Sequence, residues 1–308
     1  MSTNESAKII ETEESEKSDS HNGTITTNID GRTSIRYTHK FNRNDGMKLD
    51  NAVLIAGFSG PGLIGSIGAN YIIEKLNMHQ IACIDSEFIV PGVIYIGGKL
   101  RHPFRIYMNE EGDIYVLECE APIMIQGIHS VLSTATRWCV NNDIKKVIVL
   151  EGYPVRGIPS SGRQPIILSS DDKEQGEMLE KARLREIEST NNSNNQKRRI
   201  RKRQFENAFI GGISGGLLSA CLSNEIPCAA LLIPTTTGMP DPEGAASLIE
   251  IIGKIAENEK LNLDSKQLRK EGAGLRKQME EIIRSLRDQQ QIQQEGEGIR
   301  EQRQVMYG

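Results

Sequence analysis

The chain has 308 residues, a net charge of -4 and 25% charged residues, the composition of an ordinary soluble protein. No apolar run is long enough to span a bilayer, and no basic segment followed by an apolar stretch marks a secretory signal at the N-terminus. We therefore expect a cytoplasmic protein with no membrane partner.

The apolar residues gather in two blocks, from Ala52 to Ile167 and from Ala208 to Ile255, which predict one core built from two separated segments. The cysteines lie inside these apolar runs, form no CxxC pair and are odd in number, so we expect reduced core residues in a reducing compartment. They are Cys83, Cys119, Cys139, Cys221 and Cys228.

Residues 1–48 are polar and lack periodicity, which predicts a disordered tail. The first part of an α/β domain follows over residues 49–168. It opens with a strand from Ala52 to Ala56, the turn Gly57-Phe-Ser-Gly-Pro-Gly62 and a helix that ends near Leu76. A second strand ends at Asp85, and alternating segments up to Glu120 predict antiparallel hairpins.

The remainder of this first part contains an amphipathic helix from Ile128 to Cys139 and a strand from Lys146 to Glu151. Residues 169–206 then lose the core signal and predict a solvated insertion that is partly helical from Met178 to Ile187. It closes on the basic run Lys197 to Arg203.

The second part of the domain is expected over residues 207–260. The apolar segment Ala208 to Ile213 predicts a return to the core, and it is followed by a glycine-rich helix start and a strand from Cys228 to Ile233. Asp241 and Pro242 have the residue types of a helix cap and first position. The pattern as a whole predicts a three-layer α/β fold, with a mixed sheet, helices on both faces and an antiparallel hairpin excursion.

Residues 261–288 are expected to form a C-terminal helical segment. Apolar residues alternate there at spacings of four and three, as in a short coiled coil, and we expect Gly272 and Gly274 to interrupt the helix. The apolar positions are Leu275, Met279, Ile282 and Leu286. Residues 289–308 are rich in Gln and Glu and predict a flexible tail.

The spacing Gly60-x-Gly62-x-x-Gly65 after a strand, with Asp85 at the end of the next strand, satisfies the dinucleotide-binding fingerprint. A tight turn that permits close helix packing explains the same glycines. Because hairpin-like strands follow Asp85, where a crossover helix is required, we favour the tight turn. A nucleotide-binding enzyme or sensor remains the alternative function.

Other motifs give weaker signals. The histidines are scattered without metal-ligand spacing, and all of them precede Ser214, so Gly212-x-Ser214-x-Gly216 lacks the residues of a hydrolase triad in the required order. The run Lys197 to Arg203 lacks interleaved aromatic residues, which makes nucleic-acid binding a third and less favoured interpretation. We predict no catalytic residue, no metal and no cofactor.

Several motifs resemble the proteasome assembly chaperone family in its archaeal single-chain form. They are Gly57-Phe-Ser-Gly-Pro-Gly-Leu-Ile-Gly65, Ile89-Val-Pro-Gly92, Glu151-Gly152-Tyr153, Gly211-Gly-Ile-Ser-Gly-Gly-Leu217 and Thr235 to Pro242. The resemblance covers residues 51–167 and 208–256 and leaves out both long polar segments. It implies a non-enzymatic protein that binds the α subunits of the 20S proteasome.

The C-terminal residues Met306, Tyr307 and Gly308 match the hydrophobic, tyrosine, any-residue ending that proteasome activators and some archaeal assembly chaperones insert between α subunits. Such an ending combines a carboxylate that occurs once per chain with an aromatic body and an apolar anchor. We expect several tails to act together from a homo-oligomer, a trimer or a tetramer.

Overall fold

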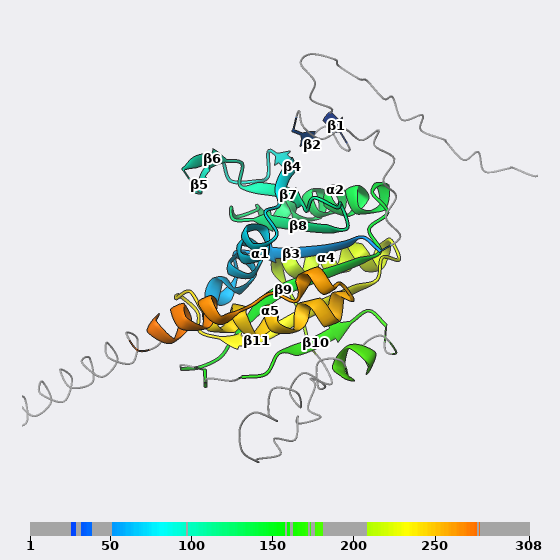
Figure 1. Cartoon of the computed structure of the whole chain (residues 1–308). Helices are drawn as coiled ribbons and strands as arrows, with labels where there is room; N and C mark the ends of the chain where they lie inside the picture. Colours follow the sequence, from blue (N-terminus) through cyan, green and yellow to red (C-terminus); the bar gives the residue numbers. More distant parts are fainter. Residues whose placement is uncertain are drawn as a thin grey trace, which may run out of the picture.

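The structure is a computed structural model, and a nine-stranded mixed sheet forms its centre (Figure 1). It describes residues 26–28, 32–38, 51–96, 98–157, 159–160, 163–171, 173, 176–180, 208–275 and 277. The strand order is β1-β2-β4-β7-β8-β3-β9-β11-β10. These strands are β1 Thr26–Asn28, β2 Thr33–Tyr37, β3 Val53–Phe58, β4 His79–Ser86, β7 Phe104–Met108, β8 Ile114–Cys119, β9 Lys146–Pro154, β10 Ile166–Ser169 and β11 Cys228–Thr235.

The middle of the sheet is parallel, and its flanks are antiparallel. Strands β8, β3, β9 and β11 run side by side in one direction, with β3 in register between β8 and β9. Every residue of β3 and of β8 is buried. Parallel strands are covered on both faces, which is why these segments read as continuous apolar runs in the sequence.

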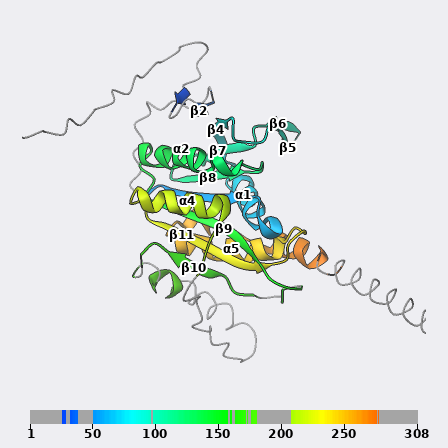
Figure 2. The ribbon, with the colours of Figure 1, turned by 180° about the vertical axis from the view of Figure 1, so that it is seen from behind.

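Helices cover both faces of the sheet, as the two ribbon views show (Figures 1 and 2). Helices α1 (Ile64–Lys75) and α5 (Pro242–Ala256) pack on one face, and α2 (Ile128–Asn141) and α4 (Gly212–Ser223) pack on the other. Each face has its own apolar cluster, one centred on Ile72 and Ile249 and one on Leu132 and Leu217. The predicted three-layer fold is therefore confirmed.

The predicted hairpins after the second strand are also present. Strands β7 and β8 pair antiparallel, and a separate two-stranded hairpin of β5 (Ile94–Ile96) and β6 (Lys99–Arg101) precedes them. Short 3-10 turns, η1 (Pro61–Leu63), η2 (Ile125–Gly127) and η3 (Glu259–Leu261), complete the elements. Among the described ranges, no helix is long and apolar enough to cross a membrane.

Three expectations are wrong in part. The disordered tail predicted for residues 1–48 includes β2, whose Ile35 is buried and which pairs with β4. Gly272 and Gly274 do not interrupt a helix, because residues 266–275 are helical throughout. The segment from Ala208 to Ile213 returns to the core only at its end: Ile213 packs against the cluster around Leu132, whereas Phe209 is 94% exposed.

The boundary of the insertion also differs from the prediction. Ser169 still belongs to β10, which pairs antiparallel with β11. Residues 176–180 are helical, as expected there, and Met178 is buried in the same cluster as Ile249. The insertion therefore begins with residues that contribute to the core, and the basic run Lys197 to Arg203 lies outside the described residues.

Candidate functional site

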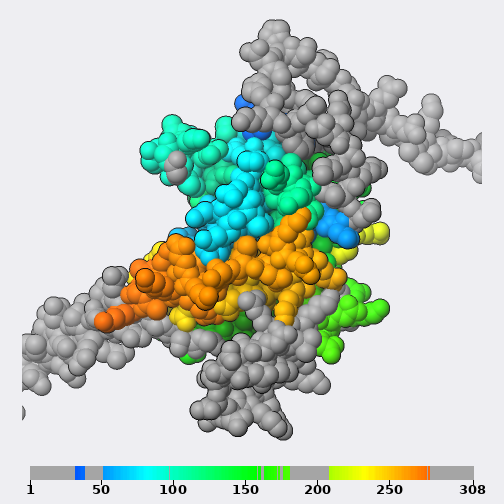
Figure 3. Space-filling model, in the orientation of Figure 1, coloured from blue at the N-terminus to red at the C-terminus, as the bar shows by residue number. Residues whose placement is uncertain are grey.

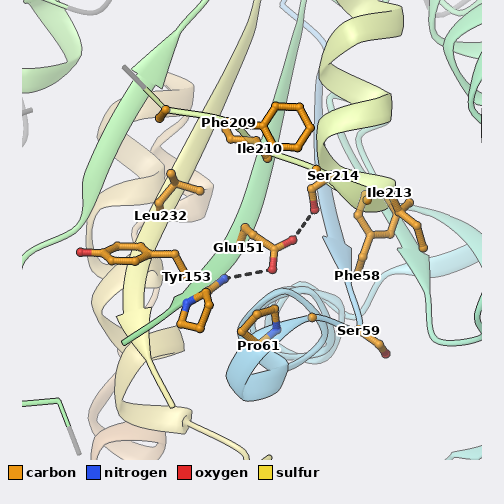
Figure 4. Close-up of a pocket in the computed structure, with 16 residues that line it drawn as sticks. Phe58, Ser59, Pro61, Glu151, Tyr153, Phe209, Ile210, Ile213, Ser214 and Leu232 are labelled. Carbon is orange, nitrogen blue, oxygen red and sulfur yellow. Dashed lines mark hydrogen bonds between the residues drawn. The ribbon is translucent and has the colours of Figure 1, made fainter. Parts of the chain in front are cut away.

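A cavity of about 490 Å³ lies where β3 and β9 end, at the carboxyl edge of the parallel strands (Figure 4). The chain leaves β3 toward α1 on one face of the sheet, whereas α4 begins at the same edge on the other face. Helices that diverge to opposite faces from neighbouring strands leave a crevice, and α/β proteins bind ligands there. The position of the cavity therefore marks a candidate binding site.

Glu151 from β9 is the centre of this cavity. Ser214, in the first turn of α4, donates its hydroxyl hydrogen to Oε2 of the Glu151 carboxylate, and the Gly152 backbone N–H donates to Oε1 at 3.2 Å. Burial raises the pKa of Glu151, and these two hydrogen bonds act in the opposite direction. The carboxylate is thus fixed between the first turn of α4 and the backbone of β9.

The glycines of the β3–α1 turn make room for Glu151. A Cβ atom on Gly60 would lie 2.3 Å from Glu151 Oε1, and one on Gly152 would lie 2.3 Å from the Pro61 carbonyl oxygen. Gly62 has φ of +65°, and a side chain there would collide with Thr235. The glycine spacing therefore serves close packing, with Gly60 against the Glu151 carboxylate and Gly62 against Thr235.

Asp241 holds the same turn from the side of α5. Its backbone N–H donates to the Gly62 carbonyl oxygen at 2.8 Å, and its carboxylate caps α5 by accepting from Gly244 N at 2.9 Å. Thr235 donates its hydroxyl hydrogen to Asp241 Oδ2 at 2.7 Å, and Arg163 forms an ion pair with the same oxygen. The predicted helix cap is confirmed, and the same residue also holds the glycine turn in place through its hydrogen bond to Gly62.

The dinucleotide fingerprint is not assembled in space. Strands β8 and β7 separate β3 from β4. At the usual spacing between neighbouring strands, β4 with its Asp85 lies about 14 Å from β3, measured across the sheet. Asp85 instead pairs with Arg36 of β2 at 2.6 Å. Glu151 places a negative charge beside Gly60, where a phosphate would have to bind. The structure thus separates Asp85 from Gly60, Gly62 and Gly65.

The carboxyl edge also carries most of the exposed large hydrophobic side chains of the described residues. All except Val140 and Leu222 belong to η1, to the β5–β6 hairpin and the loop before it, to η2 and the loop before it, or to the segment before α4. We call this set the apolar rim: Leu63, Val90, Val93, Tyr95, Ile96, Leu100, Met124, Ile125 and Phe209. Figure 3 shows the β5–β6 part of it standing out from the body. An exposed apolar set of this kind is typical of an interaction surface.

The predicted docking residues Met306, Tyr307 and Gly308 lie outside the described residues, as do Met279, Ile282 and Leu286 of the coiled-coil-like stripe. The described helix 266–275 is anchored to α5 through Arg269, which forms an ion pair with Glu250 at 2.5 Å. It leaves the body on the same side as the β5–β6 hairpin in both ribbon views (Figures 1 and 2).

Sequence reasoning did not identify the apolar rim or Arg163, and it noted Glu151 only as part of a glycine motif. A charged residue at the end of an otherwise apolar strand was the available signal for Glu151. In the part of the chain that the structure describes, no group of His, Cys, Asp and Glu side chains is arranged to hold a metal ion.

The fold and the site define a class of α/β proteins in which a three-layer sandwich carries a glycine-lined cavity at the carboxyl edge of its parallel strands. The model of the PAC2 family matches residues 54–283. This match covers well over half of the chain, and the protein belongs to the PAC2 family.

Solved structures of the same fold agree with this assignment. A protein of unknown function from Thermoplasma acidophilum is 30% identical, with a TM-score of 0.58, over 80% of this chain and 91% of that one. PbaA of Pyrococcus furiosus, an archaeal homolog of proteasome-assembly chaperone, has a TM-score of 0.63 at 22% identity over 85% and 97% of the two chains. PbaB of Pyrococcus furiosus, an archaeal proteasome activator, has a TM-score of 0.62 at 18% identity over 83% and 98%. The resemblance inferred from the glycine motifs is confirmed.

Proposed function

We propose that this protein is a cytoplasmic proteasome assembly chaperone or activator that docks on the α subunits of the 20S core particle and catalyses no reaction. Its membership of the PAC2 family and its likeness in fold to PbaA and PbaB support a role of this kind. The docking residues in this proposal are Met306, Tyr307 and Gly308.

The observation that carries the proposal is the direction in which the C-terminal helix leaves the body. Helix 266–275 points away on the side of the β5–β6 hairpin, where the apolar rim is exposed (Figures 1 and 2). Residue 277 therefore lies on the side of the molecule where the apolar rim is exposed, and the C-terminal tail starts there. The tail and the rim are therefore suited to contact one partner together.

The chemistry of the tail fits a pocket between two subunits. The terminal carboxylate pairs with a basic residue of the receiving pocket, Tyr307 supplies an aromatic body with a polar tip, and Met306 supplies an apolar anchor. One such peptide binds weakly. A homo-oligomer of three or four chains, joined through the stripe from Leu275 to Leu286, gains avidity of about 10²-fold when several tails engage at once.

The test is binding of the full chain to purified 20S core particles, measured by biolayer interferometry. The variants are a chain without residues 306–308, Tyr307→Ala and Tyr95→Ala in the apolar rim. Leu222→Ala is the control, because Leu222 is 58% exposed and lies outside the rim. We expect the two tail variants to lose at least tenfold in affinity, Tyr95→Ala to lose less, and the control to keep the affinity of the unchanged chain.

Other outcomes assign the contact differently. If Tyr95→Ala loses binding and the tail variants keep it, the apolar rim makes the contact and the tail assignment is wrong. If no version of the chain binds, the proteasome proposal itself is wrong. Circular dichroism of each variant establishes that the fold is retained.

A further inference from the structure

The cavity around Glu151 has the size and lining of a small-molecule site. Its volume of about 490 Å³ falls within the range of about 300–1,000 Å³ that is typical of ligand pockets. Apart from Glu151, the described residues that line it are uncharged, and most are apolar or glycine. A single charged group in an apolar cavity determines which ligand charge is accepted.

Glu151 offers hydrogen-bond acceptors to a ligand. A carboxylate accepts about four hydrogen bonds, and Ser214 and Gly152 supply two donors. Figure 4 shows Glu151 in the middle of the labelled lining residues, with its hydrogen bond to Ser214 of α4. A ligand with N–H donors completes the coordination of this carboxylate, and a negatively charged ligand is repelled by it.

Aromatic rings add a second element of cation recognition. Phe58 borders the cavity at the end of β3, but it is 1% exposed and its ring packs edge-on against Phe104 in the core. Tyr153 and Phe209 line the cavity from the end of β9 and from the segment before α4. The faces of such rings attract organic cations, and the attraction grows when water is excluded. Phe209 is 94% exposed at the rim, although exposing a phenyl ring to water is unfavourable. A ligand that covers this ring removes the cost.

We propose that this cavity binds a small organic cation, an ammonium group attached to an aromatic or apolar body, with Glu151 as its counter-ion. The proposal does not depend on proteasome docking, because it uses a cavity formed by β3, β9 and α4 and not the C-terminal tail. It also differs from the dinucleotide alternative, since it assigns the opposite ligand charge to the same turn.

The probes are benzylammonium, neutral benzyl alcohol and anionic benzoate, which share a phenyl ring and differ in charge. Binding to the full chain is measured by protein-observed NMR titration. We expect saturable binding of benzylammonium with a dissociation constant of about 10 mM or tighter, as for a fragment of this size. Weaker binding is expected for the alcohol, and none for benzoate.

Glu151→Gln keeps the shape of the side chain and is expected to weaken benzylammonium binding at least tenfold. Glu87→Gln is the matched control, because Glu87 is an exposed acid paired with Arg32 outside the cavity, and no change is expected. Phe209→Ala provides a second variant that leaves the core intact and is expected to weaken binding several-fold. Equal binding to wild type and Glu151→Gln, binding of benzoate as tight as that of benzylammonium, or no binding of benzylammonium overturns the proposal.

Discussion

Arg105 on β7 and Glu118 on β8 face each other across two adjacent strands, and both side chains are completely buried. Arg105 Nη2 lies 2.8 Å from Glu118 Oε2 and 2.6 Å from Glu120 Oε2. Arg105 Nη1 donates to the His102 carbonyl oxygen, and Nε donates to the Tyr107 hydroxyl. One guanidinium thus binds two carboxyl groups inside the sheet.

Replacing Arg105 with Met leaves two carboxylates close together without a cation, and Glu118 is inaccessible to water. We expect this variant to lose about 3–5 kcal/mol of unfolding free energy. The double variant Arg105→Met with Glu118→Leu removes the buried charge as well, so it is expected to recover at least half of that loss. Urea denaturation of both proteins measures the difference, and a double variant no more stable than the single one would show that the cost lies in packing.

The same cluster gives the protein a pH-dependent stability. Burial, followed by the charge of Glu120, raises the pKa of Glu118 from an ordinary 4.5 to about 7, although Arg105 and a hydrogen bond from Asn70 oppose this shift. Because the folded state then binds the proton more tightly than the unfolded state, the stabilisation is complete below about pH 4.5 and is lost as the pH rises through about 7.

We therefore expect the contribution of Glu118 to the unfolding free energy to fall between pH 4.5 and 7, by about 1–3 kcal/mol. Comparing wild type with Glu118→Gln at each pH isolates this contribution from those of the other acids. The difference in unfolding free energy between wild type and Glu118→Gln is expected to change with pH between 4.5 and 7. If this difference is constant over that range, the proton is not bound by Glu118.

Gly272 and Gly274 lie on one helix but face different surroundings. A Cβ atom on Gly272 would lie 2.5 Å from the Glu243 backbone nitrogen at the start of α5, whereas one on Gly274 would meet no atom within 4 Å. We expect Gly272→Ala to release the C-terminal helix from α5 and to speed hydrogen exchange over residues 266–275. Gly274→Ala is expected to slow that exchange, because alanine favours a helix by about 1 kcal/mol relative to glycine. Similar behaviour of the two variants would show that the helix is not docked at Gly272.

The sequence predicted the layers of the fold more accurately than its edges. Continuous apolar runs such as Val53–Phe58 identified the buried parallel strands, and apolar periodicity identified α2 and α5. The short strand β2 has a weaker signal. Only Ile35 and Tyr37 alternate toward the core, among polar neighbours, and the strand is further stabilised by backbone pairing with β4. The helix through Gly272 is likewise supported by packing on α5, which outweighs the low helix propensity of glycine.

The candidate site was harder to predict, because its residues meet only in the folded chain. Glu151 and Ser214 are far apart in the sequence, and only the convergence of β9 and α4 joins them. The glycine spacing was recognised, but its role depends on Glu151, which occupies the position that a phosphate needs. Spacing along one segment does not reveal a charge supplied by another strand.

Asp241 joins two roles that substitution can separate. Its Oδ1 caps α5, and its Oδ2 pairs with Arg163, whose side chain is 5% exposed. Asp241→Asn keeps an oxygen for the cap but loses the ion pair, whereas Asp241→Ala loses both. We expect a loss of unfolding free energy in both variants, larger for alanine by about 0.5–2 kcal/mol, the usual value of a cap.

The matched control is Asp264→Ala, since Asp264 caps the exposed start of helix 266–275 by accepting from Lys266 N at 3.0 Å. This change removes a cap without breaking a buried ion pair, so its cost is expected to be smaller than that of either Asp241 variant. The three variants are compared by thermal and urea unfolding. We expect the loss of unfolding free energy to be largest for Asp241→Ala, smaller for Asp241→Asn and smallest for Asp264→Ala. If Asp241→Asn is as stable as wild type, the ion pair with Arg163 does not stabilise the fold. The contribution of the Asp241 side chain is then its cap of α5 alone.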